Sequence, residues 1–145
     1  MRVILLTVFA FVLIGCEPIG PIPGGALKGE PTAVPADWTS AASVKTVQVQ
    51  TRPADPYSIN IWGVAVAADF YIAAARDTNR WAKYIEDDPD VRLRLGNALY
   101  DLHAVRVTDP AELARVQSAY ETKYDVGKKD DRPQEKFVFR LDRRA

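Results

Sequence analysis

Short segments in which apolar and polar residues alternate dominate the chain from Val44 onward. In one of them Val91 and Leu93 share one face while Arg92 and Arg94 share the other, because successive side chains of a strand point to opposite sides. Six segments show this alternation or an apolar run of strand length: 47–50, 59–67, 70–75, 90–95, 99–107 and 137–141. So many strands restrict the chain to a mainly β fold.

A short helix is predicted between the third and fourth of these strands. Residues 79–87 place Trp81 and Ile85 four positions apart, so that both face the core, and Pro89 ends the helix.

A longer helix is predicted after the fifth strand. It begins with Asp109 as the N-cap and Pro110 as the first helical residue, and Glu112 is placed to return the capping hydrogen bond. Its apolar stripe is formed by Leu113, Val116, Tyr120 and Tyr124. Six largely antiparallel strands with only two helices predict a small closed barrel, since closure removes exposed sheet edges.

The first sixteen residues have the features of an export signal. Arg2 supplies a positive charge, and residues 3–14 form an apolar stretch that is too short for a membrane-spanning helix of about 20 residues. The stretch ends in Leu13-Ile14-Gly15-Cys16, which resembles the lipobox of bacterial lipoproteins. The resemblance implies that residues 1–15 are a signal peptide and that Cys16 is acylated, with diacylglyceryl and a fatty acid such as palmitate. The alternative is a plain secretory signal followed by an incidental cysteine.

Acylation at Cys16 would make a membrane the partner of this protein and place it in the bacterial cell envelope. More than one acyl chain gives a stable anchor. The next residue is Glu17 and not the aspartate that favours retention in the inner membrane of enterobacteria. We therefore expect the outer membrane, with the protein facing the periplasm, if the host is Gram-negative.

The segment that follows is rich in proline and glycine. Residues 17–43 contain five of the ten prolines, and no helical or strand period repeats there. We expect residues 16–43 to form a disordered tether that reaches about 80 Å when fully extended, and residues 44–145 to form the folded domain. Trp38 has enough apolar area to dock on that domain.

Composition excludes several classes of site. The chain has one cysteine and one histidine, His103, which excludes an intramolecular disulfide and a metal site built from Cys or His clusters. Nineteen basic residues balance nineteen acidic ones, so the chain has no net positive charge to attract nucleic acid. We expect neither a metal nor a nucleic acid partner.

Three motifs carry a resemblance to a known superfamily: Ile61-Trp62-Gly63-Val64 followed by Phe70-Tyr71-Ile72, the stretch 76–91 with Trp81 and Pro89, and Ala119-Tyr120-Glu121-Thr122-Lys123-Tyr124. Together they resemble the split β-barrel proteins that include pyridoxamine-phosphate oxidase and deazaflavin (F420)-dependent nitroreductases, in an uncharacterised branch. The resemblance covers about residues 44–142. It implies a six-stranded split barrel with one short and one longer helix, commonly assembled as a homodimer.

The resemblance also implies a cofactor-binding site. In this superfamily the loop after the third strand and the start of the next helix hold the phosphate of FMN or F420. The matching residues here are Arg76, Thr78, Asn79 and Arg80. Two guanidinium groups, a hydroxyl and the N–H groups of a helix start suit an anion. The alternative is that both arginines are solvated loop charges, one of them paired with Asp77.

Two functions remain open at this point. The loop 73–77 lacks the glycines of cytosolic relatives, and Asp77 would repel a phosphate. FMN and F420 are also cytosolic products. These features favour an envelope module that binds a small ligand or a protein without redox activity. The alternative is an FMN- or F420-dependent oxidoreductase, in which the cofactor ring carries the hydride.

Two further groups of residues have open roles. His103 shares a strand face with Asp101, and we favour a structural role for His103 over an acid–base pair. Tyr120, Lys123 and Tyr124 could line a pocket, and packing is favoured for both tyrosines.

Overall fold

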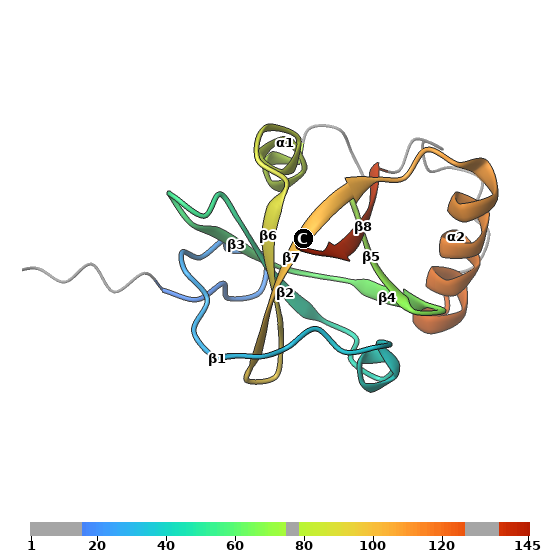
Figure 1. Ribbon diagram of the computed structural model, residues 1–145, viewed down its shortest axis with the longest axis horizontal. Coiled ribbons are helices and arrows are strands. Elements are labelled where there is room, and N and C mark those ends of the chain that lie inside the picture. The colour runs from blue at the N-terminus through green and yellow to red at the C-terminus, as the bar shows by residue number, and fades with distance from the viewer. Residues whose placement is uncertain (1–15, 75–78, 127–136) are drawn as a thin grey trace, which may run out of the picture.

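The computed structural model describes residues 16–74, 79–126 and 137–145 (Figure 1). Its strands are β1 (Glu30–Pro31), β2 (Val47–Thr51), β3 (Tyr57–Ile61), β4 (Gly63–Val66), β5 (Asp69–Ala74), β6 (Asp90–Leu95), β7 (Ala98–Arg106) and β8 (Phe137–Arg143). The helices are the one-turn 3-10 helix η1 (Thr39–Ala41), α1 (Arg80–Asp87) and α2 (Pro110–Tyr124). No helix within these ranges is long and apolar enough to cross a membrane.

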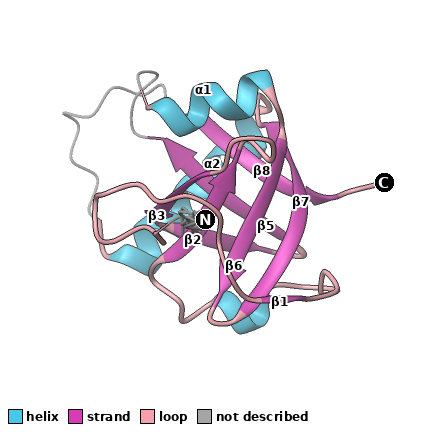
Figure 2. Ribbon diagram, turned by 90° about the vertical axis from the view of Figure 1, so that its left-hand side faces the viewer, coloured by secondary structure: helices cyan, strands magenta, loops and turns pink. Residues whose placement is uncertain are grey.

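Seven strands form one antiparallel sheet in the order β3-β2-β6-β7-β8-β5-β4, and the two-residue β1 pairs in parallel with β7. The sheet curls into a half-barrel (Figure 2). The mainly β fold is confirmed, but the strand number of six is wrong. The segment 59–67, predicted as one strand, is divided at Trp62 into the end of β3 and all of β4.

This division explains the curvature of the sheet. β3 and β4 are its two edges, yet only Trp62 separates them in the chain. Two edges that are joined by one residue must lie close together there, so the sheet has to bend round on itself. No pairing between β3 and β4 occurs in the described residues, and the barrel is therefore split at this point.

The core fills the inside of the curled sheet. Val91 and Leu93 of β6 are buried there, as the alternation predicted, beside Trp81 and Ile85 of α1. A second apolar cluster lies under α2 and contains Val64, Tyr71, Val107, Val116 and Val138. Alternate residues of β5 therefore pack in different clusters. Phe70 and Ile72 face the main core, and Tyr71 faces α2.

The segment predicted to be a disordered tether instead lies on the barrel. Leu27 is buried, and its N–H donates to Oε1 of Gln50 at 2.8 Å. Trp38 is 2% exposed and packs against Phe70 and Tyr100, so its predicted docking is confirmed. Prolines lack an N–H donor, which lets an extended segment cover a barrel with few donors left to satisfy. Burial of Leu27 and Trp38 then favours the docked state, and the folded part includes residues 16–43.

The start of α2 differs from prediction in one bond. Asp109 is the N-cap, and its carboxylate accepts from the N–H of Glu112 at 2.8 Å, as predicted. The Glu112 side chain does not return the bond. It accepts from the hydroxyl of Tyr71 and from Arg140, both at 2.9 Å. A cation and a phenol on the adjoining strands compete more strongly for this carboxylate than one backbone N–H.

Candidate functional site

A groove of about 460 Å³ opens at the start of α1. Asn79 and Arg80, two of the four predicted cofactor residues, lie in its wall. The other two, Arg76 and Thr78, lie outside the described residues. The rest of the lining is Gly20, Pro21, Pro23, Tyr57, Ile59, Asn60, Ile61, Ala73 and Trp81. We refer to this cavity as the α1 groove.

The polar part of the α1 groove is the beginning of the helix. Asn79 is the N-cap residue, and its carbonyl oxygen accepts from the N–H groups of Ala82 and Lys83 at 3.1 and 3.3 Å. Its side chain makes no capping hydrogen bond. Arg80 is exposed, and no ion pair to it occurs within the described ranges. The groove therefore offers a cation, an amide and the positive end of a helix to a ligand.

The N-terminal segment supplies another part of the wall of the α1 groove. Asn60 of β3 holds it there, because its Nδ2 donates to the carbonyl oxygens of Pro18 and Gly20 at 3.2 and 3.0 Å. Its Oδ1 accepts from Gln48 at 3.0 Å. Sequence reasoning missed Asn60, Gly20 and Pro21 as groove residues. For Gly20 and Pro21 only the proline- and glycine-rich composition of their segment was visible, and composition does not say where such a segment docks.

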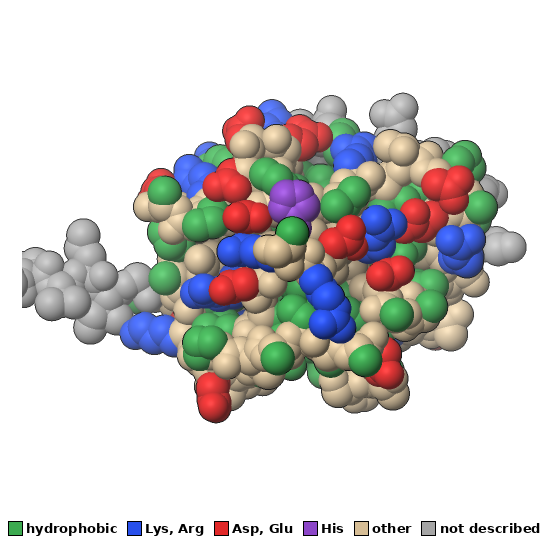
Figure 3. Space-filling view, in the orientation of Figure 1, with side chains coloured by type: hydrophobic (Ala, Val, Ile, Leu, Met, Phe, Trp, Pro, Cys, Tyr) green, Lys and Arg blue, Asp and Glu red, His purple; other side chains and the backbone are tan. Residues whose placement is uncertain are grey.

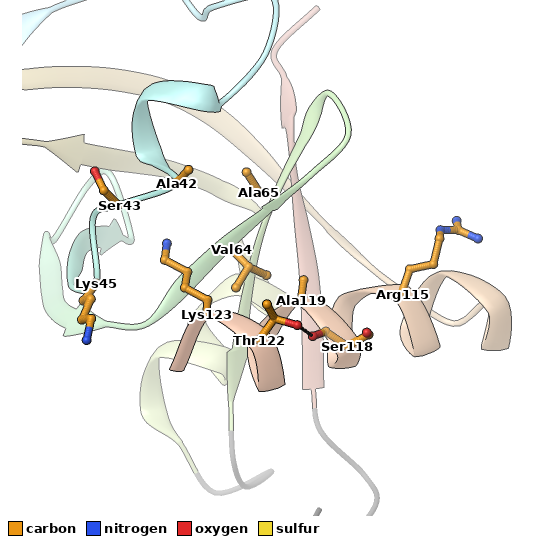
Figure 4. A pocket seen from close by; sticks show the side chains of 10 residues that line it. All are labelled: Ala42, Ser43, Lys45, Val64, Ala65, Arg115, Ser118, Ala119, Thr122 and Lys123. Atoms are coloured by element: carbon orange, nitrogen blue, oxygen red, sulfur yellow. Dashed lines mark hydrogen bonds between the residues drawn. The ribbon is translucent and has the colours of Figure 1, made fainter. Parts of the chain in front are cut away.

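A second groove, of about 780 Å³, lies between α2, β4 and the end of η1 (Figure 4). Its lining is Ala42, Ser43, Lys45, Val64, Ala65, Arg115, Ser118, Ala119, Thr122 and Lys123. The Lys123 ammonium donates to the carbonyl oxygens of Ala41 and Gly63 at 3.1 and 2.8 Å, and burial lowers its pKa. Lys45 and Arg115 point away from one another and do not converge on one point (Figure 4). Lys123 therefore lines a groove and also ties α2 to β4 and η1.

The two tyrosines near Lys123 pack, as predicted. Tyr124 stacks on Trp62 with ring centroids 4.3 Å apart, and its hydroxyl accepts from the N–H of Gly63 at 3.0 Å. The hydroxyl of Tyr120 donates to the carbonyl oxygen of Trp62 at 3.1 Å. Burial raises the pKa of both phenols. Both side chains fix the chain at the split between β3 and β4.

His103 does not form a catalytic pair with Asp101. Its Nδ1 lies 3.1 Å from Oδ1 of Asp90, while Asp101 accepts from Arg92 at 2.7 Å, and this bond lowers the pKa of Asp101. On the paired strands β6 and β7, His103 thus contacts Asp90 and Arg92 contacts Asp101, so the side chains form a row of exposed cross-strand pairs. This arrangement fits the structural role predicted for His103. Acidic and basic side chains are interspersed over the face shown in Figure 3. Within the described ranges, no three His, Cys, Asp or Glu side chains gather as a metal site would require.

Cys16 is the first described residue, and it lies against the fold. Its carbonyl oxygen accepts from the N–H of Gly25 at 2.9 Å. The adjoining Glu17 accepts from Arg94 of β6 at 2.5 and 3.1 Å, and this bond lowers the pKa of Glu17. The predicted acylation site is therefore connected directly to the barrel.

Known structures share this fold. A conserved hypothetical protein from Mycobacterium tuberculosis superposes with a TM-score of 0.61 at 16% identity, over 80% of this chain and 86% of that one. A putative pyridoxamine 5'-phosphate oxidase from Listeria innocua gives 0.54 at 10% identity, over 67% and 82%. An FAD-binding protein from Mesorhizobium loti gives 0.52 at 13% identity, over 74% and 87%. The fold is thus the split barrel of pyridoxamine-phosphate-oxidase-like proteins.

Sequence comparison gives the family. No curated protein sequence matches the chain. The model of a family described as uncharacterized proteins conserved in bacteria, DUF2255, matches residues 39–136. This match spans about two thirds of the chain and includes α1, α2 and the strands β2 to β7. The chain therefore belongs to the DUF2255 family.

Proposed function

We propose that this protein is an envelope lipoprotein, anchored through Cys16, whose split barrel binds a small anionic ligand in the α1 groove. One observation carries the ligand proposal: Asn79 and Arg80, chosen from the sequence, line one cavity together with apolar residues from β3 and α1. A guanidinium beside apolar walls suits a ligand that carries a negative group at one end and a flat apolar part at the other.

The start of α1 adds to the attraction for an anion. The first helical hydrogen bonds come from the N–H groups of Ala82 and Lys83. The N–H groups of Arg80 and Trp81 precede them, so the helix itself does not use them. A bound phosphate or carboxylate would accept from such groups and from Arg80. Ile59, Ile61 and Trp81 would cover the apolar part of the ligand.

An FMN- or F420-dependent oxidoreductase is the second candidate, favoured by the likeness to an FAD-binding protein and a putative pyridoxamine 5'-phosphate oxidase. The groove residues fit the phosphate end of such a cofactor. Arg80 and Asn79 would hold the phosphate, and the apolar wall would exclude water from the ring. The cofactor, when bound, supplies hydride transfer. No carboxylate or imidazole lines the groove within the described ranges, so these residues would bind and orient the cofactor.

The test is a titration of the mature chain in detergent with FMN and with F420. Binding is measured during each titration as quenching of fluorescence. Saturable binding that weakens at least tenfold in Arg80→Met supports the site. Lys83→Met is the matched control, because Lys83 is exposed on the same helix but does not line the groove. No binding of either compound would remove the flavin candidate, and unchanged affinity in Arg80→Met would contradict the site.

Redox activity separates the two candidates. Bound reduced FMN that passes electrons to a quinone faster than free reduced FMN supports the oxidoreductase. Equal rates support a binding protein. The anchor is tested separately by mass spectrometry of the Cys16 peptide and by fractionation of cells that express Cys16→Ser. We expect the variant to leave the outer membrane fraction, and acylation-independent membrane retention would contradict the anchor.

A further inference from the structure

The tight turn between Ile19 and Ile22 presents two bare isoleucines to solvent. Their exposures are 71% and 65%, the highest of the large apolar residues in the described chain. The two residues pair across an antiparallel bridge, with N–H to carbonyl distances of 3.0 and 2.9 Å. Paired residues of such a bridge place their side chains on the same face. Gly20, with φ +55°, and Pro21 complete the turn.

This turn is held firmly on the barrel. Gly24 exchanges two backbone hydrogen bonds of 2.8 Å with Ser58 of β3. A Cβ on Gly24 would lie 2.4 Å from the carbonyl oxygen of Cys16, so only glycine permits this close approach. Together with the Asn60 bonds to Pro18 and Gly20, these contacts fix the direction in which the turn projects.

The charges beside the turn favour a lipid surface. The carboxylate of Glu17 is neutralised by Arg94, and the residues 18–27 carry no charge at all. The next charged residue is Lys28, which is exposed. An apolar tip in an uncharged stretch, with the cation Lys28 directly after that stretch, suits the interface of a phospholipid bilayer, where lipid phosphates attract lysine.

The distance to the anchor decides which partner covers the turn. Ile19 follows Cys16 by three positions, with only Glu17 and Pro18 between them, a span of at most about 10 Å. We propose that Ile19 and Ile22 enter the bilayer interface beside the acyl chains of Cys16, so that the barrel lies directly on the membrane surface. This inference rests on the proposed anchor. Since Gly20 and Pro21 also line the α1 groove, docking places that groove at the bilayer surface.

The test uses the acylated chain in vesicles of phosphatidylethanolamine and phosphatidylglycerol. Acylation consumes the only natural thiol, so Ile22→Cys provides a single site for an NBD fluorophore. Ser118→Cys on α2 is the control, because α2 lies at the other end of the molecule from the blue start of the described chain (Figure 1). We expect NBD at position 22 to brighten severalfold and to be quenched by doxyl lipids, and NBD at position 118 to do neither. Equal behaviour at both positions would overturn the docking.

A second variant guards against insertion driven by the fluorophore itself. Ile19→Asp, added to the labelled Ile22→Cys chain, should reduce lipid quenching at least threefold if the turn docks. Unchanged quenching would show that the fluorophore alone entered the bilayer and would overturn the proposal. Vesicle sedimentation and the mass of the Cys16 peptide are measured on the same samples. An acylated, sedimenting chain with an exposed position 22 contradicts docking alone, whereas an unacylated, soluble chain contradicts the anchor and docking together.

Discussion

The ammonium of Lys123 lies 2.8 Å from the carbonyl oxygen of Gly63, sixty residues earlier in the chain. It also donates to Ala41 at 3.1 Å, so a single side chain of α2 holds both β4 and η1. Lys123→Met removes both bonds and leaves two carbonyl groups without this donor. We expect the free energy of unfolding to fall by about 1–3 kcal/mol in urea denaturation.

Lys45→Met is the control for this variant. Lys45 lines the same groove, but its side chain is exposed. Its replacement should change the free energy of unfolding by no more than about 0.5 kcal/mol. Equal losses in the two variants would show that charge in the groove, and not the bonds to Ala41 and Gly63, stabilises the fold.

Two tryptophans test whether the N-terminal segment is part of the fold. Trp38 is 2% exposed between Phe70 and Tyr100, whereas Trp62 is 46% exposed and stacks on Tyr124. Trp38→Ala should lower the free energy of unfolding by about 3–5 kcal/mol, the usual cost of emptying an aromatic site in a core. Trp62→Ala should cost about 1 kcal/mol. Similar urea midpoints for the two variants would argue for a segment that does not contribute to stability.

The junction of α2 with the sheet contains a half-buried ion pair. Arg140 of β8 donates to Glu112 at 2.9 Å, and Glu112 retains 15% of its side-chain exposure. Arg140→Met leaves the Glu112 carboxylate with Tyr71 as its donor and also removes the bonds of Arg140 to Asp142 at 2.7 and 3.1 Å. We expect a loss of about 1–3 kcal/mol in the free energy of unfolding. Arg115→Met, on the exposed side of α2, should have little effect. A neutral result for Arg140→Met would mean that the ion pairs of Arg140 with Glu112 and Asp142 together only offset their own desolvation.

Alkaline pH should destabilise the protein through three phenols. Burial raises the pKa of Tyr71, Tyr120 and Tyr124 above the ordinary value of 10, and the bond to Glu112 adds to the effect at Tyr71. A group whose pKa is higher in the folded state contributes stability that is complete below its unfolded pKa and is lost as pH rises through its folded pKa. We therefore expect the free energy of unfolding to decline above about pH 10.

Phenolate absorbance provides the readout for this effect. The three tyrosines should ionise together with unfolding, and Tyr71→Phe should make the alkaline decline shallower. Ionisation of all six tyrosines of the chain near their ordinary pKa, without loss of structure, would contradict this prediction.

Local patterns were enough to predict several elements. The alternation in 90–95 identified the buried face of β6, and the Asp109-Pro110 pair identified the start of α2. Such signals depend only on neighbouring residues, because strand period and helix capping are local properties. The same applies to Asn79 and Arg80, whose place at a helix start follows from their position before Trp81 and which do line a common groove.

Other features depended on contacts between distant residues. Nothing local shows that the apolar run 59–67 divides at Trp62, because both halves have strand character and only their different partners, β2 and β5, separate them. The N-terminal segment is a similar case. Its order comes from Gln50, Asn60 and Arg94, which lie 23 to 77 residues away from their partners in it.

The sequence by itself thus determined the mainly β class, both helices and the buried faces of β6 and α1, since those follow from periodicity and capping. Tertiary structure alone decided where the barrel splits, that the proline-rich segment folds onto it, and that this segment forms one wall of the α1 groove. The physical reason is that an extended segment without a period has no preferred partner of its own. The donors and acceptors that fix it become neighbours only once the sheet has curled.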